Sequence, residues 1–454
     1  MGKRISDYLN RKKSHAATLA FFRIAFGSLM FFSVLRFWSK GWIESLYIKP
    51  NFHFKYFGFE WVQDFGNYTY ILFILCLISS LFVTIGFKYR ISIISFFILF
   101  TYVELIDKTT YLNHYYLVSL ILFMLIFLPA SSRFSIDSSK TTNFYFVPRW
   151  TIDSLKIMLC IVYFHAGIAK VNSDWLLNAQ PLKIWLLGNY DIPLIGDSLL
   201  QQNWVHYAMS WGGMFYDIFI PFLLLIPKTR NIAFLLVIIF HVLTKILFPA
   251  IGMFPFIMIL GCLIFFDNKF HEKIIRFISK YLQIPQMDAL AIKNKSQIKT
   301  SFFSVLTIGF FLFIQLLLPL RHNLYDGELF WTERGYRFSW RVMLVEKKGF
   351  AEFKLIDNDN YNSFYIKNED YLTDFQEKQM SFQTDFIKEF VDYLGDFYKA
   401  KGYSNIEIHV DCFVTLNGRR SKRLIKKNTD ILNIDMKTFY KNCIIPFEDE
   451  IKKI

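Results

Sequence analysis

The chain has 454 residues, of which 54% are hydrophobic and 19% aromatic, whereas only 19% are charged. This composition excludes an ordinary soluble protein and predicts a polytopic membrane protein. The net charge of +14 is confined to one part: 29 Lys plus Arg stand against 15 Asp plus Glu before residue 321, and 22 stand against 22 from there on. An excess in the membrane part is a topology signal, so nucleic acid is not expected as a partner.

Nine apolar segments are expected to span the membrane. The first follows a basic N-terminus and is long enough to be retained, which predicts a span and not a cleaved signal peptide. Several others are shorter than the ~20 residues that a perpendicular helix needs. If all nine cross, the loops on one side carry 19 Lys plus Arg and those on the other carry 6, so the N-terminus is expected in the cytoplasm and everything after about residue 320 outside. The segments are residues 18–38, 69–87, 91–106, 112–130, 151–170, 204–226, 231–248, 251–266 and 301–319.

Lys170 is the strongest candidate for chemistry, because it closes the apolar fifth segment just before a polar turn. Even lenient insertion scales charge a lysine about 2.5 to 3.5 kcal/mol at mid-membrane, so ionisable residues at such depth usually serve a function. The plainer alternative is a snorkelling lysine that lifts its ammonium to the interface.

His114 opens the fourth segment, directly after a polar stretch that contains Asp107 and Lys108. The fourth segment starts and the fifth ends at the same exported face, so we expect His114 and Lys170 to share one cavity. The alternative is that His114 only caps a helix and that Asp107 and Lys108 form a solvated loop pair.

Four further ionisable residues lie inside apolar segments: Arg23, Asp217, His241 and Lys245. Unpaired they would be costly, so we expect them to pair with one another, line a wet cavity or snorkel. His165 and His241 could ligate a haem in a helical bundle, although nothing in their spacing demands it.

Residues 267–300 are amphipathic and basic, with apolar positions at helical spacing. They are expected to form a helix that lies on the cytoplasmic leaflet. A plain connecting loop would not keep that spacing.

From about residue 320 the composition becomes that of a soluble domain. Alternating stretches at 350–356, 363–366 and 406–416 predict strands, and an apolar stripe within 382–401 predicts a helix. The predicted fold is therefore a polytopic α-helical membrane protein of about nine spans, residues 1–320, followed by an exported soluble α+β domain, residues 321–454.

Two features of the exported tail leave alternatives open. The basic run within 419–427 is either a solvated strand edge or a site for an acidic peptide or lipid head groups. Cys412 and Cys443 lie on the side where disulfides persist, so a bridge between them is an open alternative. The five cysteines show no paired metal-ligand spacing, and no metal is expected.

Several separated motifs carry a resemblance that covers most of the chain. They are Phe22-Arg23 with Phe26-Gly27-Ser28-Leu29-Met30, Tyr89-Arg90-Ile91-Ser92, Asp107-Lys108-Thr109 with Asn113-His114, Ala166-Gly167 with Lys170 and Asp174-Trp175, Phe240-His241 with Gly252-Met253-Phe254, and Phe338-Ser339-Trp340 with Met343. In this order they resemble the vitamin K-dependent gamma-glutamyl carboxylases and their bacterial relatives, which share a horizontally transferred transmembrane domain.

The resemblance implies roles for individual residues. Lys170 matches the lysine regarded as the base that deprotonates the reduced quinone, and His114 matches the histidine implicated in handling the glutamate carbanion. An amine is a base only when neutral, and burial favours the neutral form. The residues expected to contact the quinone or the other substrate are Arg23, Asp107, Tyr111, Asn113, His241 and Trp340.

The implied reaction oxidises a reduced naphthoquinone, vitamin K or menaquinol, with O2 to its epoxide. Oxygen adds to the deprotonated quinol, the resulting alkoxide removes the γ-proton of a glutamate in a protein or peptide, and CO2 traps the carbanion without a metal. The chain departs from animal members at Ala169, where they carry a second lysine, and at Tyr111-Leu112, which replaces a Trp-Asn pair. A bacterial member, in the inner membrane, would use menaquinol.

A second class of function stays open. It is a quinone-binding membrane oxidoreductase or monooxygenase that has kept the base without carboxylation, or a non-catalytic envelope protein built on the same domain. Retention of both Lys170 and His114 argues against the non-catalytic version. The sequence specifies neither the substrate protein nor the oligomeric state.

Overall fold

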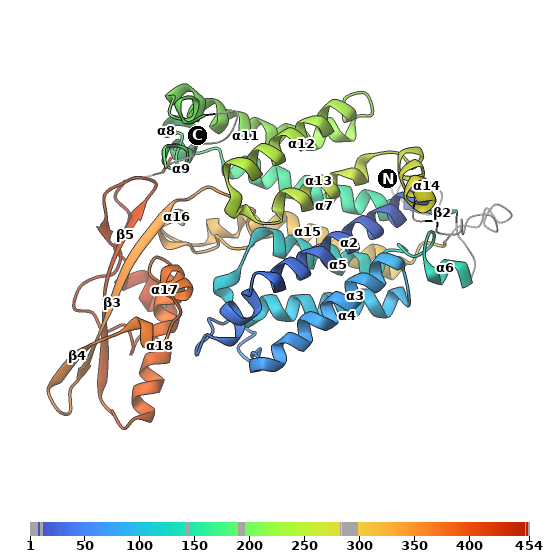
Figure 1. The fold of residues 1–454 in the computed structure, drawn as a ribbon. Coiled ribbons are helices and arrows are strands. Elements are labelled where there is room, and N and C mark those ends of the chain that lie inside the picture. Colours follow the sequence, from blue (N-terminus) through green and yellow to red (C-terminus); the bar gives the residue numbers. More distant parts are fainter. Residues whose placement is uncertain are drawn as a thin grey trace.

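The computed structural model describes residues 8–9, 12–140, 145–188, 196–281, 283, 298–449 and 451–452. A bundle of helices forms the larger part, and a β-sheet with two covering helices stands at one end of it (Figure 1). This arrangement confirms the predicted fold class, a helical membrane protein with a C-terminal α+β region.

All nine predicted apolar segments are helical. Within the described residues, seven helices have the length and apolar composition of a membrane span, whereas two are shorter. The seven contain α2 (Ala16–Ser39), α3 (Thr69–Ile85) with the 3₁₀ turn Gly66–Tyr68 before it, α4 (Tyr89–Ile106), α7 (Trp150–Ala169), α11 (Asn203–Leu225), α12 (Arg230–Leu247) and α15 (Phe302–Leu317) with the 3₁₀ helix Leu318–Leu324 after it. The short ones are α5 (Asn113–Phe127) and α13 (Phe254–Cys262).

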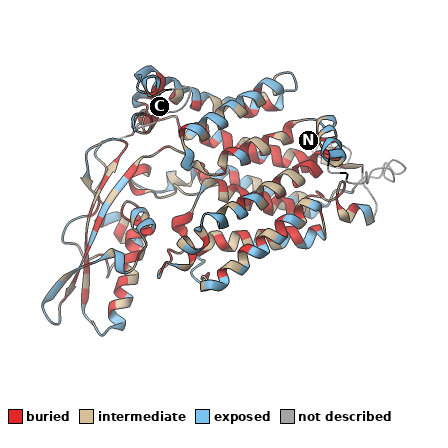
Figure 2. Ribbon diagram, viewed as in Figure 1, coloured by how far each residue is buried: buried red, intermediate tan, exposed pale blue. Residues whose placement is uncertain are grey.

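α7 is the most interior of the long helices. Of its most apolar window, 72% is buried, against 17% for the window that includes α15. Large apolar side chains such as Ile91, Ile232 and Phe310 stay uncovered on other helices, and Figure 2 shows exposed positions on the outer faces with buried ones between the helices. Lipid tails would cover such an outer surface. A polar group on α7 is therefore shielded from lipid by its neighbours.

α7 and α11 touch at Gly167. A Cβ atom on this glycine would lie 2.6 Å from Ile218 Cγ1 and 2.8 Å from Ile218 N, closer than real side chains approach. Small residues at such crossings let two helix backbones come together. The contact brings Asp217, on α11, beside the end of α7.

The other end of the bundle is closed by short elements. β1 (Lys13–His15) pairs antiparallel with β2 (Phe146–Pro148), and α6 (Ile136–Lys140) lies between α5 and β2 in the chain. α14 (Asn268–Tyr281) packs against α2. The predicted amphipathic helix of residues 267–300 is thus helical as far as Tyr281, and its residues 282 and 284–297 lie outside the described residues.

The C-terminal region is a four-stranded antiparallel sheet in the order β4-β3-β5-β6. The three predicted strands and the predicted helix are confirmed, and α18 buries its apolar stripe, with Phe386, Phe390 and Leu394, against the sheet. The strands are β3 (Lys347–Asp357), β4 (Asn362–Ile366), β5 (Ile406–Leu416) and β6 (Lys422–Arg423), and the helices are α17 (Asp374–Met380) and α18 (Thr384–Ala400). The other short α-helices among the described residues are α8 (Ser173–Asn178), α9 (Leu182–Leu187), α10 (Asp197–Leu200), α16 (Leu329–Thr332) and α19 (Met436–Thr438).

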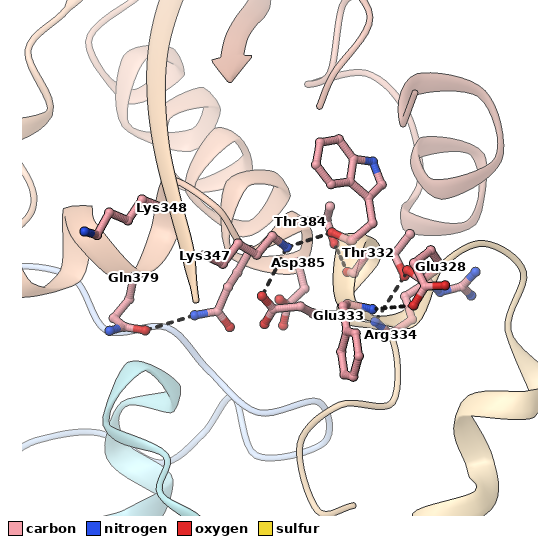
Figure 3. A network of polar contacts seen from close by, with 12 residues as sticks. Glu328, Thr332, Glu333, Arg334, Lys347, Lys348, Gln379, Thr384 and Asp385 are labelled. Carbon is pink, nitrogen blue, oxygen red and sulfur yellow. Dashed lines mark hydrogen bonds and ion pairs between the residues drawn. The ribbon is translucent and has the colours of Figure 1, made fainter. Parts of the chain in front are cut away.

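The turn after α16 connects the bundle to the sheet. Lys347 Nζ, at the start of β3, donates to Trp331 O at 2.7 Å and lies 3.1 Å from Glu333 Oε1. Thr384 Oγ1, at the start of α18, donates to Thr332 O at 2.5 Å. Figure 3 shows this network from close by. These contacts fix the direction in which the chain leaves the membrane part.

The bridge between Cys412 and Cys443 is not formed. Both cysteines are free and buried. Cys412 Sγ, on β5, instead donates to Ser381 O at 3.4 Å. Burial raises the pKa of the Cys412 thiol to about 12. This thiol is therefore a packed core group and not one half of a disulfide.

Candidate active site

Lys170 caps the C-terminal end of α7 and points inward. Its Nζ donates to Asp217 Oδ2 at 2.6 Å and to Ala166 O at 3.2 Å, and it lies 5.4 Å from the centre of the Trp175 ring. Lys170 and Asp217 are only 5% and 6% exposed. The ammonium thus has a carboxylate partner inside the protein. The snorkelling alternative requires it to extend to the membrane surface, and it does not. Asp217 pairs as its position inside a span demands.

The Lys170–Asp217 pair lines an apolar cavity between α7, α11, α12 and α13. The cavity holds about 730 Å³ of empty volume, its open mouth included. Its remaining lining is mostly apolar and includes three phenylalanines. The lining residues with polar side chains, besides the tryptophan, are Tyr163, Lys170, Asp217, His241 and Thr244.

A second polar end of the cavity is formed by Tyr163 and His241. Tyr163 Oη lies 3.1 Å from His241 Nε2, and 3.5 Å from both Tyr216 Oη and Cys262 Sγ. His241 Nδ1 is buried without a partner among the described residues. Tyr163 stands seven residues before Lys170, which places the two on the same face of α7 about 10 Å apart along its axis. The cavity therefore carries polar groups at two separate positions.

His114 does not line this cavity. It is buried in the first turn of α5, and its ring centre lies 6.2 Å from that of Phe254. The His241 ring lies 5.8 Å from the same phenylalanine. Phe254 thus contacts the rings of His114 and His241, and the expectation of one cavity shared by His114 and Lys170 is not met. The cause is α13, which the sequence did not place between them.

Tyr111 and Asn113 hold a segment of the C-terminal region. Tyr111 Oη accepts from Phe338 N at 2.8 Å and donates to Asn113 Oδ1 at 3.0 Å. Asn113 Nδ2 donates to Arg341 O at 3.4 Å. Tyr111 and Asn113 therefore bind the backbone of residues 338–341 and do not line the Lys170 cavity.

Trp340 belongs to the same segment and is packed rather than open. Its ring stacks on Tyr116 with 5.1 Å between centres. Phe338, Trp340 and Met343 all have positive φ, between 54° and 61°, which costs non-glycine residues of order 1–3 kcal/mol each. Val342 and Met343 line the cavity. The strained segment is thus a wall of the site, held in place by Tyr111 and Asn113.

Asp107 and Lys108 bind the C-terminal region, and the solvated-pair alternative is wrong. Asp107 is fully buried, and its Oδ2 accepts from Gln376 Nε2 at 2.8 Å. Lys108 Nζ lies 2.8 Å from Glu389 Oε2 and 3.1 Å from Asp385 Oδ2. Neither residue lines the Lys170 cavity.

Arg23 lies toward the other end of the bundle. Its Nη1 donates to Ala130 O at 3.1 Å, and its Nη2 donates to Phe134 O. Both carbonyls follow the C-terminal end of α5, whereas Asp107 and His114 precede or begin that helix. Arg23 therefore does not reach the cavity.

Three contributions to the site were not predicted from the sequence. Tyr163 looked like one aromatic residue among many. Gly167 and Asp174 were named only as members of a motif, and their contacts depend on where α11 and the C-terminal region lie. Asp174 is 1% exposed, and it pairs with Arg419 Nη2 at 2.6 Å and accepts from Asn417 Nδ2 at 2.8 Å. Arg419 belongs to the basic run of the tail, so part of that run binds the membrane domain.

Two family comparisons match the two parts of the chain. Residues 10–270 match the family model described as the HTTM domain, and residues 300–450 match that of the vitamin K-dependent gamma-carboxylase, lumenal domain. The chain belongs to the vitamin K-dependent gamma-carboxylase family. No solved structure matches it. Membership in this family supports a carboxylase-like function in an integral membrane protein whose C-terminal region corresponds to the lumenal domain.

Proposed function

We propose that this member of the gamma-carboxylase family couples oxidation of a reduced naphthoquinone to carboxylation of glutamate. The overall reaction converts quinol, O2, CO2 and a glutamate residue into quinone epoxide, water and gamma-carboxyglutamate. The observation that carries the proposal is a buried lysine with a carboxylate partner, 2.6 Å away, at the wall of an apolar cavity.

The apolar lining of the cavity suits a flat bicyclic quinol. Binding pockets for such molecules are mostly apolar, with a few placed polar groups that fix orientation. Phe240, Phe248 and Phe254 offer aromatic surface. The Lys170 and His241 positions offer polar contacts for two oxygens on opposite sides of one ring. The quinol supplies the reducing electrons, and the protein supplies orientation and proton transfer.

Lys170 acts as the base toward one quinol hydroxyl. Proton transfer by a positioned side chain contributes roughly 10²- to 10⁴-fold to a rate. The neighbouring apolar lining excludes water, which would otherwise compete for the same proton. The unpartnered His241 Nδ1 binds the second oxygen, with Tyr163 holding the ring of His241 in place.

His114 acts on the glutamate from the other side of Phe254. The ring contact of Phe254 with both His114 and His241 brings the two substrates together at this phenylalanine. The glutamate arrives from the exported side, where the start of α5 faces the C-terminal region. His114→Ala should therefore impair carboxylation more than epoxide formation, as measured by both products in one reaction.

A quinone oxidoreductase without carboxylation is the second candidate, because His114 does not line the cavity. The test incubates purified protein with menaquinol, O2, labelled bicarbonate and a pool of glutamate-containing peptides, and analyses peptides and quinone by mass spectrometry. Labelled peptide together with epoxide supports the carboxylase. Epoxide or quinone without labelled peptide supports the oxidoreductase. If the reaction yields no labelled peptide and no oxidised quinone, both candidate functions are contradicted.

A further inference from the structure

The partner of Lys170 has a function of its own. We infer that the base of this site is the Lys170–Asp217 pair acting as one unit. A resting Lys170 ammonium cannot accept a further proton, so the proton that leaves the quinol is balanced by protonation of the Asp217 carboxylate. The inference rests on the proposed function and adds Asp217 to it, as a residue that acts through Lys170.

The geometry isolates the pair. Lys170 Nζ and Asp217 Oδ2 lie 2.6 Å apart, and both side chains are more than nine-tenths buried. Among the described residues, Asp217 accepts a hydrogen bond from Lys170 alone. Lys and Asp occur once each in the cavity lining, which has no other side chain with a fixed charge. A proton transferred within this pair therefore moves between Lys170 Nζ and Asp217 Oδ2, because the other acceptor of Nζ, the carbonyl oxygen of Ala166, accepts a hydrogen bond but does not take the proton.

Charge balance gives Asp217 its role. In an apolar cavity a net charge is costly, but the pair is neutral both as ammonium with carboxylate and as amine with carboxylic acid. When one proton leaves a quinol hydroxyl, the pair ends as ammonium with carboxylic acid and carries one positive charge. The bound substrate then carries one negative charge beside it. The cavity stays neutral throughout, and no free amine has to exist beforehand.

The helix contact at Gly167 supports this pairing. The close approach of α7 and α11 sets Asp217 at hydrogen-bond distance from Lys170 rather than one water molecule away. Proton transfer within a pair needs this direct contact.

Asp217→Asn separates the two roles of the carboxylate. Asparagine still accepts a hydrogen bond from an ammonium but cannot take a proton at this position. We expect single-turnover epoxidation to fall by roughly 10²- to 10⁴-fold while menaquinol still binds, and Asp217→Glu to recover part of the rate. Glu104→Gln is the matched control, because Glu104 is another carboxyl on a spanning helix and lines a different cavity.

The deciding measurement is an infrared difference spectrum, taken without oxygen, of the intact protein with menaquinol minus the protein alone. We expect a protonated-carboxyl band that moves in D2O, that persists in Glu104→Gln and that is missing from Asp217→Asn. A wild type without this band, or an Asp217→Asn protein that keeps it or turns over at the wild-type rate, overturns the inference. If Asp217→Asn does not fold, the shift of the band in Asp217→Glu decides. A wild type that makes no epoxide would instead overturn the proposed function.

Discussion

Two lysines near the same end of the bundle bind carboxylates in different surroundings. Lys170 Nζ lies 2.6 Å from the single carboxylate of Asp217, at the wall of a cavity. Lys108 Nζ lies between two carboxylates, at 2.8 and 3.1 Å, where the bundle meets the C-terminal region. The two contacts are alike in distance, although the carboxylate side chains that bind Lys108 are 21% and 22% exposed and that of Asp217 is 8% exposed. What differs is the space beside them, because only Lys170 faces a volume that a substrate can enter.

The comparison shows that a buried ion pair is not in itself a sign of catalysis. Burial alone raises the pKa of Asp385, but Arg337 and Lys108 outweigh it and hold that pKa below its ordinary value. Such a site keeps its charges fixed and binds two parts of the chain together. The Lys170 site keeps one carboxylate for one ammonium and leaves room for a third group.

The largest expected effect is a difference in activity between the same substitution, lysine to arginine, made at Lys170 and at Lys108. Lys170→Arg should lower the rates of epoxidation and carboxylation by roughly 10²-fold or more, because arginine keeps the charge but does not give up its proton. Lys108→Arg should keep most of the activity, because it needs only charge and reach. Both rates are measured on folded protein reconstituted with menaquinol.

Lys170→Ala extends this test. A small added amine should partly restore its activity, because it can enter the vacated space, and the rescue should rise with the fraction of free amine as the pH rises. Wild-type turnover by Lys170→Arg would refute the assignment of the base.

The next effect concerns Lys108 alone. Lys108→Ala removes the ammonium that pairs with both Glu389 and Asp385. This should destabilise the docking of the C-terminal region onto the bundle by about 3–5 kcal/mol. Limited proteolysis between the two parts, compared with wild type, measures this loosening. An unchanged cleavage rate would mean that Arg337, 2.8 Å from Asp385, is a sufficient partner.

Acid should weaken the same junction. The folded-state pKa of Asp385 is depressed, so its contribution is fully present above the unfolded-state pKa of about 3.9 and is lost as the pH falls through the lower folded-state pKa. Asp385→Asn should lack this part of the acid dependence.

The sequence predicted the elements better than the contacts between them. Apolar runs placed the nine predicted spanning segments, and alternation placed the strands β3, β4 and β5, because burial of such stretches dictates secondary structure locally. The two-residue strand β6 was not predicted. Lys170 stood out because an ammonium next to hydrocarbon needs a reason. The partner of Lys170 could not be read, since Asp217 follows it by 47 residues and depends on how α11 crosses α7.

His114 shows the limit of topology as an argument. Two residues at one membrane face can still be separated by a third element, and here Phe254 of α13 lies against His114. Asp107 and Lys108 show the converse. Charged residues before a span look solvated until a second domain, more than 250 positions later in the chain, covers them.

A smaller effect tests the helix contact behind the Lys170 pair. Gly167→Ala would place a Cβ atom 2.6 Å from Ile218 Cγ1, and overpacking of this kind costs typically 1–3 kcal/mol. The helices should move apart, lengthen the Lys170–Asp217 contact and reduce epoxidation by about 10-fold. Gly309→Ala, on α15, meets nothing within 4 Å and should leave the rate unchanged. Equal rates in the two variants would show that the close crossing is not needed.

The last prediction changes no activity and tests where the two lysines face. The charge asymmetry of 19 against 6 in the loops predicts a cytoplasmic N-terminus and places both lysines, in that prediction, near the exported face. Asn358, in the turn after β3, is half-buried and Ser139, on α6, is exposed, and these two elements lie at opposite ends of the molecule (Figure 1). An impermeant thiol reagent applied to intact cells should label a cysteine at position 358 and miss one at position 139. Labelling at 139 alone would invert the topology, and the carboxylated protein would then have to be cytoplasmic.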